Sequence, residues 1–174
     1  MNRTLAIFSN PTPYFKGLRP ITGSVLAAIL MQQLEYWFDR SGDGFYKFLE
    51  PCQHAAYREG DSWVEELGFS SEEFRTAFDK IGIRYKSRTQ HGKAIATKQL
   101  FIKEDGTTAM YCSYFDKIKG MTFYYRNHSK VDAQIEMLCA NSVSSEPRLL
   151  ETNNPKPQKP TTPSSSIYRD YYRD

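Results

Sequence analysis

The chain has 174 residues and a formal net charge of +3, and aromatic residues make up 14% of it, with 12 Tyr and 11 Phe. This length suits one folded domain with appendages, and the aromatic content argues against a wholly disordered chain. A net charge this small is weak evidence that the protein binds nucleic acid. Local clusters of charge therefore carry more weight than the net charge of the chain. No apolar stretch approaches the length of a membrane span.

Three cysteines are odd in number and widely spaced: Cys52, Cys112 and Cys139. No secretory signal precedes them, so we expect reduced thiols and a cytoplasmic location. Cys52-Gln53-His54 is too sparse for zinc, and His91 and His128 have no ligand partner at suitable spacing. No glycine-rich phosphate loop is present. We therefore expect no metal, no cofactor and no enzymatic activity.

Residues 1–20 are expected to form an irregular N-terminal extension, because prolines interrupt them. Thr22 is the expected N-cap of the longest helix, which runs to about Arg40. Its wide apolar face is typical of a central core helix: Val25, Leu26, Ile29, Leu30, Leu34, Trp37 and Phe38. Residues 45–49 then alternate aromatic residues with Lys, as a short strand does.

Two short helices follow, each starting with the spacing of a capping box. Ser62 would cap the first through Glu65, and this helix would stop at Gly68. Ser70 would cap the second through Glu73. The second helix has one apolar face at helical spacing: Phe74, Ala77, Phe78 and Ile81. Two helices joined by so short a turn must cross steeply, as in a helix-turn-helix unit, although the caps alone fit any helical hairpin equally well.

Residues 83–103 are basic and contain no Asp or Glu. We expect a turn at His91-Gly92 and strands at 99–103 and 108–115, because the Asp-Gly pair within residues 104–107 is a strong hairpin signal. A hairpin directly after a helix-turn-helix is a wing, and its Lys and Arg would suit phosphate. The alternative is a solvated edge strand whose lysines block aggregation.

Residues 116–120 are a second expected turn, and residues 121–126 are a further strand. A last helix would begin at Ser129 and end near Ala140. From residue 141 the composition becomes rich in Pro, Ser, Thr and Asn, which predicts a disordered tail. The tail ends in three tyrosines that we interpret as a partner-docking peptide, with an unselective chain end as the alternative: Tyr168, Tyr171 and Tyr172.

Residues 28–37, Ala28-Ile29-Leu30-Met31-Gln32-Gln33-Leu34-Glu35-Tyr36-Trp37, resemble the first helix of winged-helix replication proteins of phages, plasmids and other mobile elements. Residues 66–70 followed by Phe74-Arg75 resemble the helix-turn-helix of that family. The resemblance covers about residues 21–138. It implies that the chain binds a replication origin and recruits a helicase or another replication protein through a flexible C-terminal segment. Two features depart from the family: extra β segments before Arg126, and a second helix that is less basic than expected.

The sequence thus predicts an α+β fold, a winged helix-turn-helix with an extended β wing and a C-terminal helix over residues 21–140, followed by a disordered tail over 141–174. We expect it to bind double-stranded DNA in replication initiation, with a homodimer as an open option. A transcriptional regulator with the same fold and a protein-binding module that does not bind DNA are the alternatives. The predicted DNA contacts are Ser71, Arg75, Thr76, Lys80, Arg84, Lys86, Arg88, His91, Lys93 and Lys98.

Among these contacts, Arg75 and Thr76 are expected to approach the major groove, while the basic wing supplies most of the affinity. Glu72 and Asp79 on the same helix would repel phosphate, although a carboxylate can accept a hydrogen bond from a cytosine amino group.

Overall fold

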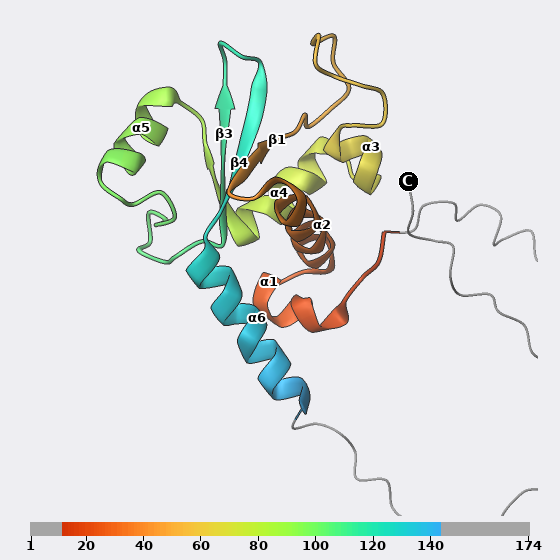
Figure 1. Ribbon diagram of the computed structural model, residues 1–174, viewed down its shortest axis with the longest axis vertical. Helices are drawn as coiled ribbons and strands as arrows, with labels where there is room; N and C mark the ends of the chain where they lie inside the picture. The colour runs from red at the N-terminus through yellow and green to blue at the C-terminus, as the bar shows by residue number, and fades with distance from the viewer. Residues whose placement is uncertain (1–11, 144–174) are drawn as a thin grey trace, which may run out of the picture. The chain divides into compact units, whose positions relative to one another are not determined.

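A computed structural model of the protein describes residues 12–143 (Figure 1). Within this range the fold is α+β, with six α-helices and one four-stranded sheet. The elements in chain order are the 3-10 helix η2 (Lys16–Leu18), α1 (Arg19–Thr22), α2 (Val25–Ser41), β1 (Gly44–Tyr46), α3 (Trp63–Leu67), α4 (Ser71–Ile81), β2 (Gly82–Tyr85), α5 (Arg88–Ala96), β3 (Tyr111–Asp116), β4 (Met121–Arg126) and α6 (His128–Val143). The tail was predicted over residues 141–174, but residues 141–143 belong to α6. The rest of the predicted tail, with its three tyrosines, lies outside the described residues.

The two short helices α3 and α4 form as their caps predict. The Ser62 hydroxyl accepts a hydrogen bond from the Glu65 amide, and the Glu65 carboxylate accepts one from the Ser62 amide. Ser70 and Glu73 form the same reciprocal pair at the start of α4. Gly68 ends α3 with a φ of 67°, in the left-handed region that glycine adopts without steric penalty.

The prediction that Thr22 caps the long helix was wrong. Thr22 is the last residue of α1, and its hydroxyl donates to the Leu18 carbonyl at 2.9 Å. Gly23, with a φ of 77°, ends α1. Ser24 is the N-cap of α2, and its side chain accepts from the Ala27 amide at 3.1 Å. The supposedly irregular N-terminal extension is therefore helical from residue 16 to residue 22.

The last helix also starts earlier than the sequence predicts. The Asn127 side chain, not that of Ser129, accepts from the Lys130 amide at 3.2 Å, and α6 begins at His128. Asn is among the best N-cap residues, so both spacings were chemically reasonable.

The prediction that residues 83–103 are a β wing was wrong. Residues 82–85 form strand β2, which pairs parallel to β3, and residues 88–96 form helix α5. The Ser87 hydroxyl caps α5 by accepting from the Gln90 amide at 3.2 Å, and the expected turn at His91-Gly92 lies inside this helix. The turn at residues 104–107 does form, but only one bridge, between Ile102 and Thr108, flanks it.

The sheet has the strand order β1-β4-β3-β2. β3 and β4 form an antiparallel hairpin, residues 111–126, that projects from the rest of the fold (Figure 1). β1 pairs antiparallel to β4 and spans Gly44–Tyr46, so only the first two residues of the strand predicted at 45–49 are confirmed. Because side chains alternate along a strand, one face of this sheet meets α2, α3 and α4, and the other meets α5.

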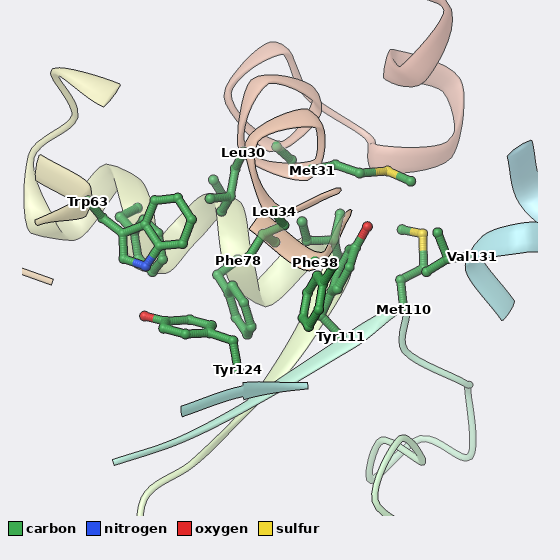
Figure 2. Packing of buried hydrophobic residues seen from close by; sticks show 14 of the residues in the cluster. Leu30, Met31, Leu34, Phe38, Trp63, Phe78, Met110, Tyr111, Tyr124 and Val131 are labelled. Carbon is green, nitrogen blue, oxygen red and sulfur yellow. The ribbon is translucent and has the colours of Figure 1, made fainter. Parts of the chain in front are cut away.

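The core lies between the sheet and helices α2, α3 and α4. Figure 2 shows Leu30 and Leu34 of α2 facing Phe78 of α4, with Trp63 and Tyr124 beside them. Trp63 is fully buried, and its ring meets that of Tyr124 edge to face, with the centroids 5.7 Å apart. This aromatic packing holds α4 against the sheet with its outer side facing solvent.

Gly82 shows how closely α4 approaches the strand that follows it. A Cβ at Gly82 would come within 2.5 Å of the Phe78 ring, so only glycine fits there. Its backbone is extended, so the close approach, and not an unusual φ, requires the glycine.

Candidate nucleic-acid interface

A groove with a volume of about 590 Å³ lies between the first half of α4, the loop at residues 48–52 and the hairpin. Phe74 of α4 and Tyr124 of β4 contribute aromatic walls, and Ser113 and Phe115 contribute from β3. α4 reaches this groove because its apolar side is anchored in the core. The groove therefore joins the outer surface of α4 to a projecting β-hairpin.

Three of the predicted DNA-contact cations line this groove: Arg75, Arg84 and Lys86. Arg75 and Lys86 are exposed. Arg84 is held by Asp79 through two hydrogen bonds of 2.6 Å, which raise the pKa of its guanidinium. This bidentate pair orients Arg84. It also neutralises the charge of Asp79, one of the two carboxylates expected to repel phosphate.

The remaining acidic groups of α4 differ in their availability. The carboxylate of Glu73 accepts from the Ser70 amide at 2.8 Å, and hydrogen bonds from Ser70 lower its pKa. Glu72 is exposed and has no recorded hydrogen bond or ion pair among the residues described. The half-buried Ser71 donates its hydroxyl to Glu50, so this predicted contact is partly committed to the groove wall. Thr76 and Lys80 are exposed on the outer side of α4, as predicted.

The tip of the hairpin carries cations that the sequence interpretation missed. Lys117 and Lys119 are exposed on either side of Ile118, which is 82% exposed. The Asp116 carboxylate accepts from the amides of Ile118 and Lys119, and Gly120 closes the turn with a φ of 63°. A Lys-Ile-Lys-Gly turn between two aromatic strands was visible in the sequence. The Asp-Gly pair upstream was the stronger hairpin signal, so the hairpin was predicted too early in the chain.

The other predicted cations lie on the opposite side of the sheet. Arg88, Lys93 and Lys98 are exposed on or directly after α5. His91 packs flat on Tyr114, with the ring centroids 4.4 Å apart, and is only 8% exposed. His91 is therefore removed from the predicted DNA contacts, because its ring is occupied in holding α5 to the sheet.

No family model matches the chain, and neither does any curated protein or solved structure. Between residues 12 and 143, none of the helices combines the length and the apolar character that crossing a membrane requires.

Proposed function

We propose that this protein binds duplex DNA as a winged helix, with α4 as the recognition helix and the β3–β4 hairpin as the wing. The order of elements carries the proposal. A long helix, α2, is followed by strand β1, the helix pair α3–α4 and a hairpin whose second strand pairs with β1. A winged helix has this order, and β2 and α5 are then an insertion between the recognition helix and the wing.

The distribution of charge supports this orientation on DNA. Arg75 and Lys86 line the groove beside α4, and Lys117 and Lys119 flank the tip of the hairpin. Cations on both sides of the groove suit two stretches of phosphate backbone, one beside the recognition helix and one under the wing. We expect Arg75 and Thr76, which are exposed on α4, to reach base edges.

A role in starting the replication of a mobile element rests on the resemblance of residues 28–37 and 66–75 to that family. Regulation of transcription would use the same surface, and the genomic neighbourhood of the gene separates the two roles. A helicase gene, a primase gene or an array of origin repeats beside it favours replication. Recruitment of a replication protein by the C-terminal tail belongs to the same proposal.

The test compares two double variants that each remove two positive charges. Lys86→Gln with Lys117→Gln removes one positive charge from the groove and one from the wing, whereas Arg88→Gln with Lys93→Gln removes two from α5. Binding to a labelled random-sequence duplex is measured over a range of salt concentrations. The groove variant is expected to flatten the slope of log K against log salt by about 0.9 for each lost phosphate contact, and the α5 variant to leave it nearly unchanged.

Two results would contradict the proposal. Equal slopes for both variants would show that the groove is not on the DNA backbone. No measurable duplex affinity even at low salt would reject DNA binding. In that case the exposed carboxylate of Glu72 favours the alternative, in which the outer surface of α4 contacts a protein.

A further inference from the structure

The face of the sheet opposite the core carries an unbroken row of aromatic side chains. Tyr85 of β2 pairs with Tyr114 of β3, Tyr114 pairs with Phe123 of β4, and Phe123 pairs with Tyr46 of β1. Paired residues in a sheet point to the same face. The row therefore crosses all four strands, and it points away from the core because the neighbouring Tyr124 points into the core.

Helix α5 covers only half of this row. His91 lies flat on Tyr114 and 5.4 Å from the ring of Tyr85, measured between centroids. At the other end, Phe123 is half-buried and Tyr46 is 46% exposed. Their two rings meet edge to face at 6.2 Å. Two aromatic rings on adjacent strands are thus left beside the helix with access to solvent.

Positive charge lies against one of these open rings and on the helix beside them. The ammonium group of Lys119 lies 5.2 Å from the centroid of the Phe123 ring. Across the row, α5 presents Arg88 and Lys93 and contains no acidic residue. The carboxylate nearest in the hairpin, that of Asp116, is occupied by the amides of the hairpin tip.

We propose that this face binds single-stranded nucleic acid, with bases stacked on Tyr46 and Phe123 and phosphates along the cations of α5 and Lys119. Exposed aromatic rings beside cations are the arrangement that holds unpaired bases. A duplex presents base edges and not base faces, so it cannot use these rings. A second copy of the chain, placed symmetrically on the row, would bring two acid-free α5 helices to one interface.

This surface goes beyond the proposed duplex binding and does not depend on it. The groove beside α4 is lined mainly by residues on the core face of the sheet, whereas the rings of Tyr46 and Phe123 lie on the other face. The two surfaces share Tyr85, which also lines the groove, and Lys119 at the hairpin tip.

The test measures the anisotropy of a fluorescein-labelled oligothymidine as the protein is titrated in. Tyr46→Leu and Phe123→Leu are each expected to weaken binding about tenfold, the effect of losing one stacked base. Tyr36→Leu is the matched control, because Tyr36 is 44% exposed on α2, away from the row. It is expected to bind the oligothymidine as the unmodified protein does. Thermal unfolding followed by circular dichroism verifies that each variant is folded.

Three results would overturn the inference. The first is that the unmodified protein does not bind oligothymidine. The second is that folded Tyr46→Leu binds it as tightly as the unmodified protein. The third is that sedimentation shows a dimer which Tyr46→Leu dissociates while oligothymidine binding is unchanged. Loss of duplex binding with retained oligothymidine binding would reject only the winged-helix proposal.

Discussion

One face of the sheet is covered by three helices that bury a continuous aromatic cluster, whereas the other is covered by a single nine-residue helix, α5. On the first face Trp63 and Tyr111 are fully buried. On the second, α5 buries only His91 and Ala94 of its own residues. The difference indicates that packing on the first face stabilises the fold. On the second face, α5 is less firmly packed, and part of the sheet surface remains exposed.

Charged groups follow the same division. On the core side, Lys47 is almost completely buried and its ammonium lies 2.6 Å from the Glu66 carboxylate. Arg126, with a side chain only 10% exposed, bridges Glu35 and Asp132 at 2.8 and 2.7 Å. Buried charges need such partners, because an unpaired charge in a core is strongly destabilising. The exposed cations of α5 have no recorded ion pair among residues 12–143 and remain available to a ligand.

Truncating one aromatic residue on each face of the sheet is expected to give the largest difference in stability between the two faces. Trp63→Ala is expected to lower the free energy of unfolding by about 3–5 kcal/mol, because it leaves a cavity among fully packed rings. Tyr114→Ala is expected to cost about half as much, since α5 can settle into the space. Urea unfolding followed by tryptophan fluorescence for Tyr114→Ala, and by circular dichroism for both variants, measures the two effects. Equal losses would show that α5 is packed as firmly as the core.

The well-packed face was also the predictable one. Both capping boxes, the left-handed Gly68 and the apolar spacing in α4 are local signals, and each appears in the structure where the sequence places it. Local hydrogen bonds and a helical repeat of large apolar residues leave few alternatives for such a segment.

The α5 segment could not be predicted in the same way. The residues that α5 buries are His91 and Ala94, a polar and a small residue, so the helix has no apolar repeat to recognise. Its place is decided by the aromatic row beneath it, which forms only when strands distant in the sequence pair. The hairpin was misplaced for a related reason. An Asp-Gly turn is a strong local signal, but the pairing of β4 with β1 selects the later hairpin.

Two glycine substitutions, one on each side of the sheet, are expected to change the free energy of unfolding by smaller amounts. Gly68→Ala is expected to destabilise the protein by about 1 kcal/mol, because alanine is strained at a φ of 67°. Gly92→Ala is expected to stabilise it by about 0.5–1 kcal/mol, because Gly92 lies inside α5 and its Cβ would meet nothing within 4 Å. The urea midpoint of each variant shows whether its stability has fallen or risen. Stabilisation without any gain in hydrogen-exchange protection of α5 would mean that this helix does not limit stability.

The smallest expected effect is a pH dependence confined to the α5 side. Burial lowers the pKa of His91 below its ordinary value of 6.5, and the rings of Tyr85, Tyr114 and Tyr125 surround it without offering a negative charge at neutral pH. The unfolded chain therefore binds a proton at His91 more readily than the folded protein does. Stability is then present above pH 6.5 and is lost as the pH falls below it, through the folded pKa.

Hydrogen exchange of the α5 amides at pH 7 and pH 5, corrected for the intrinsic rate, measures this loss directly. Protection of α5 is expected to decrease at the lower pH while that of α2 does not. His91→Phe keeps a flat ring on Tyr114 but cannot be protonated, so it should abolish the decrease. A decrease that persists in His91→Phe would show that another group controls the docking of α5. A parallel decrease in α2 would show that the two faces of the sheet open together and would remove the distinction between them.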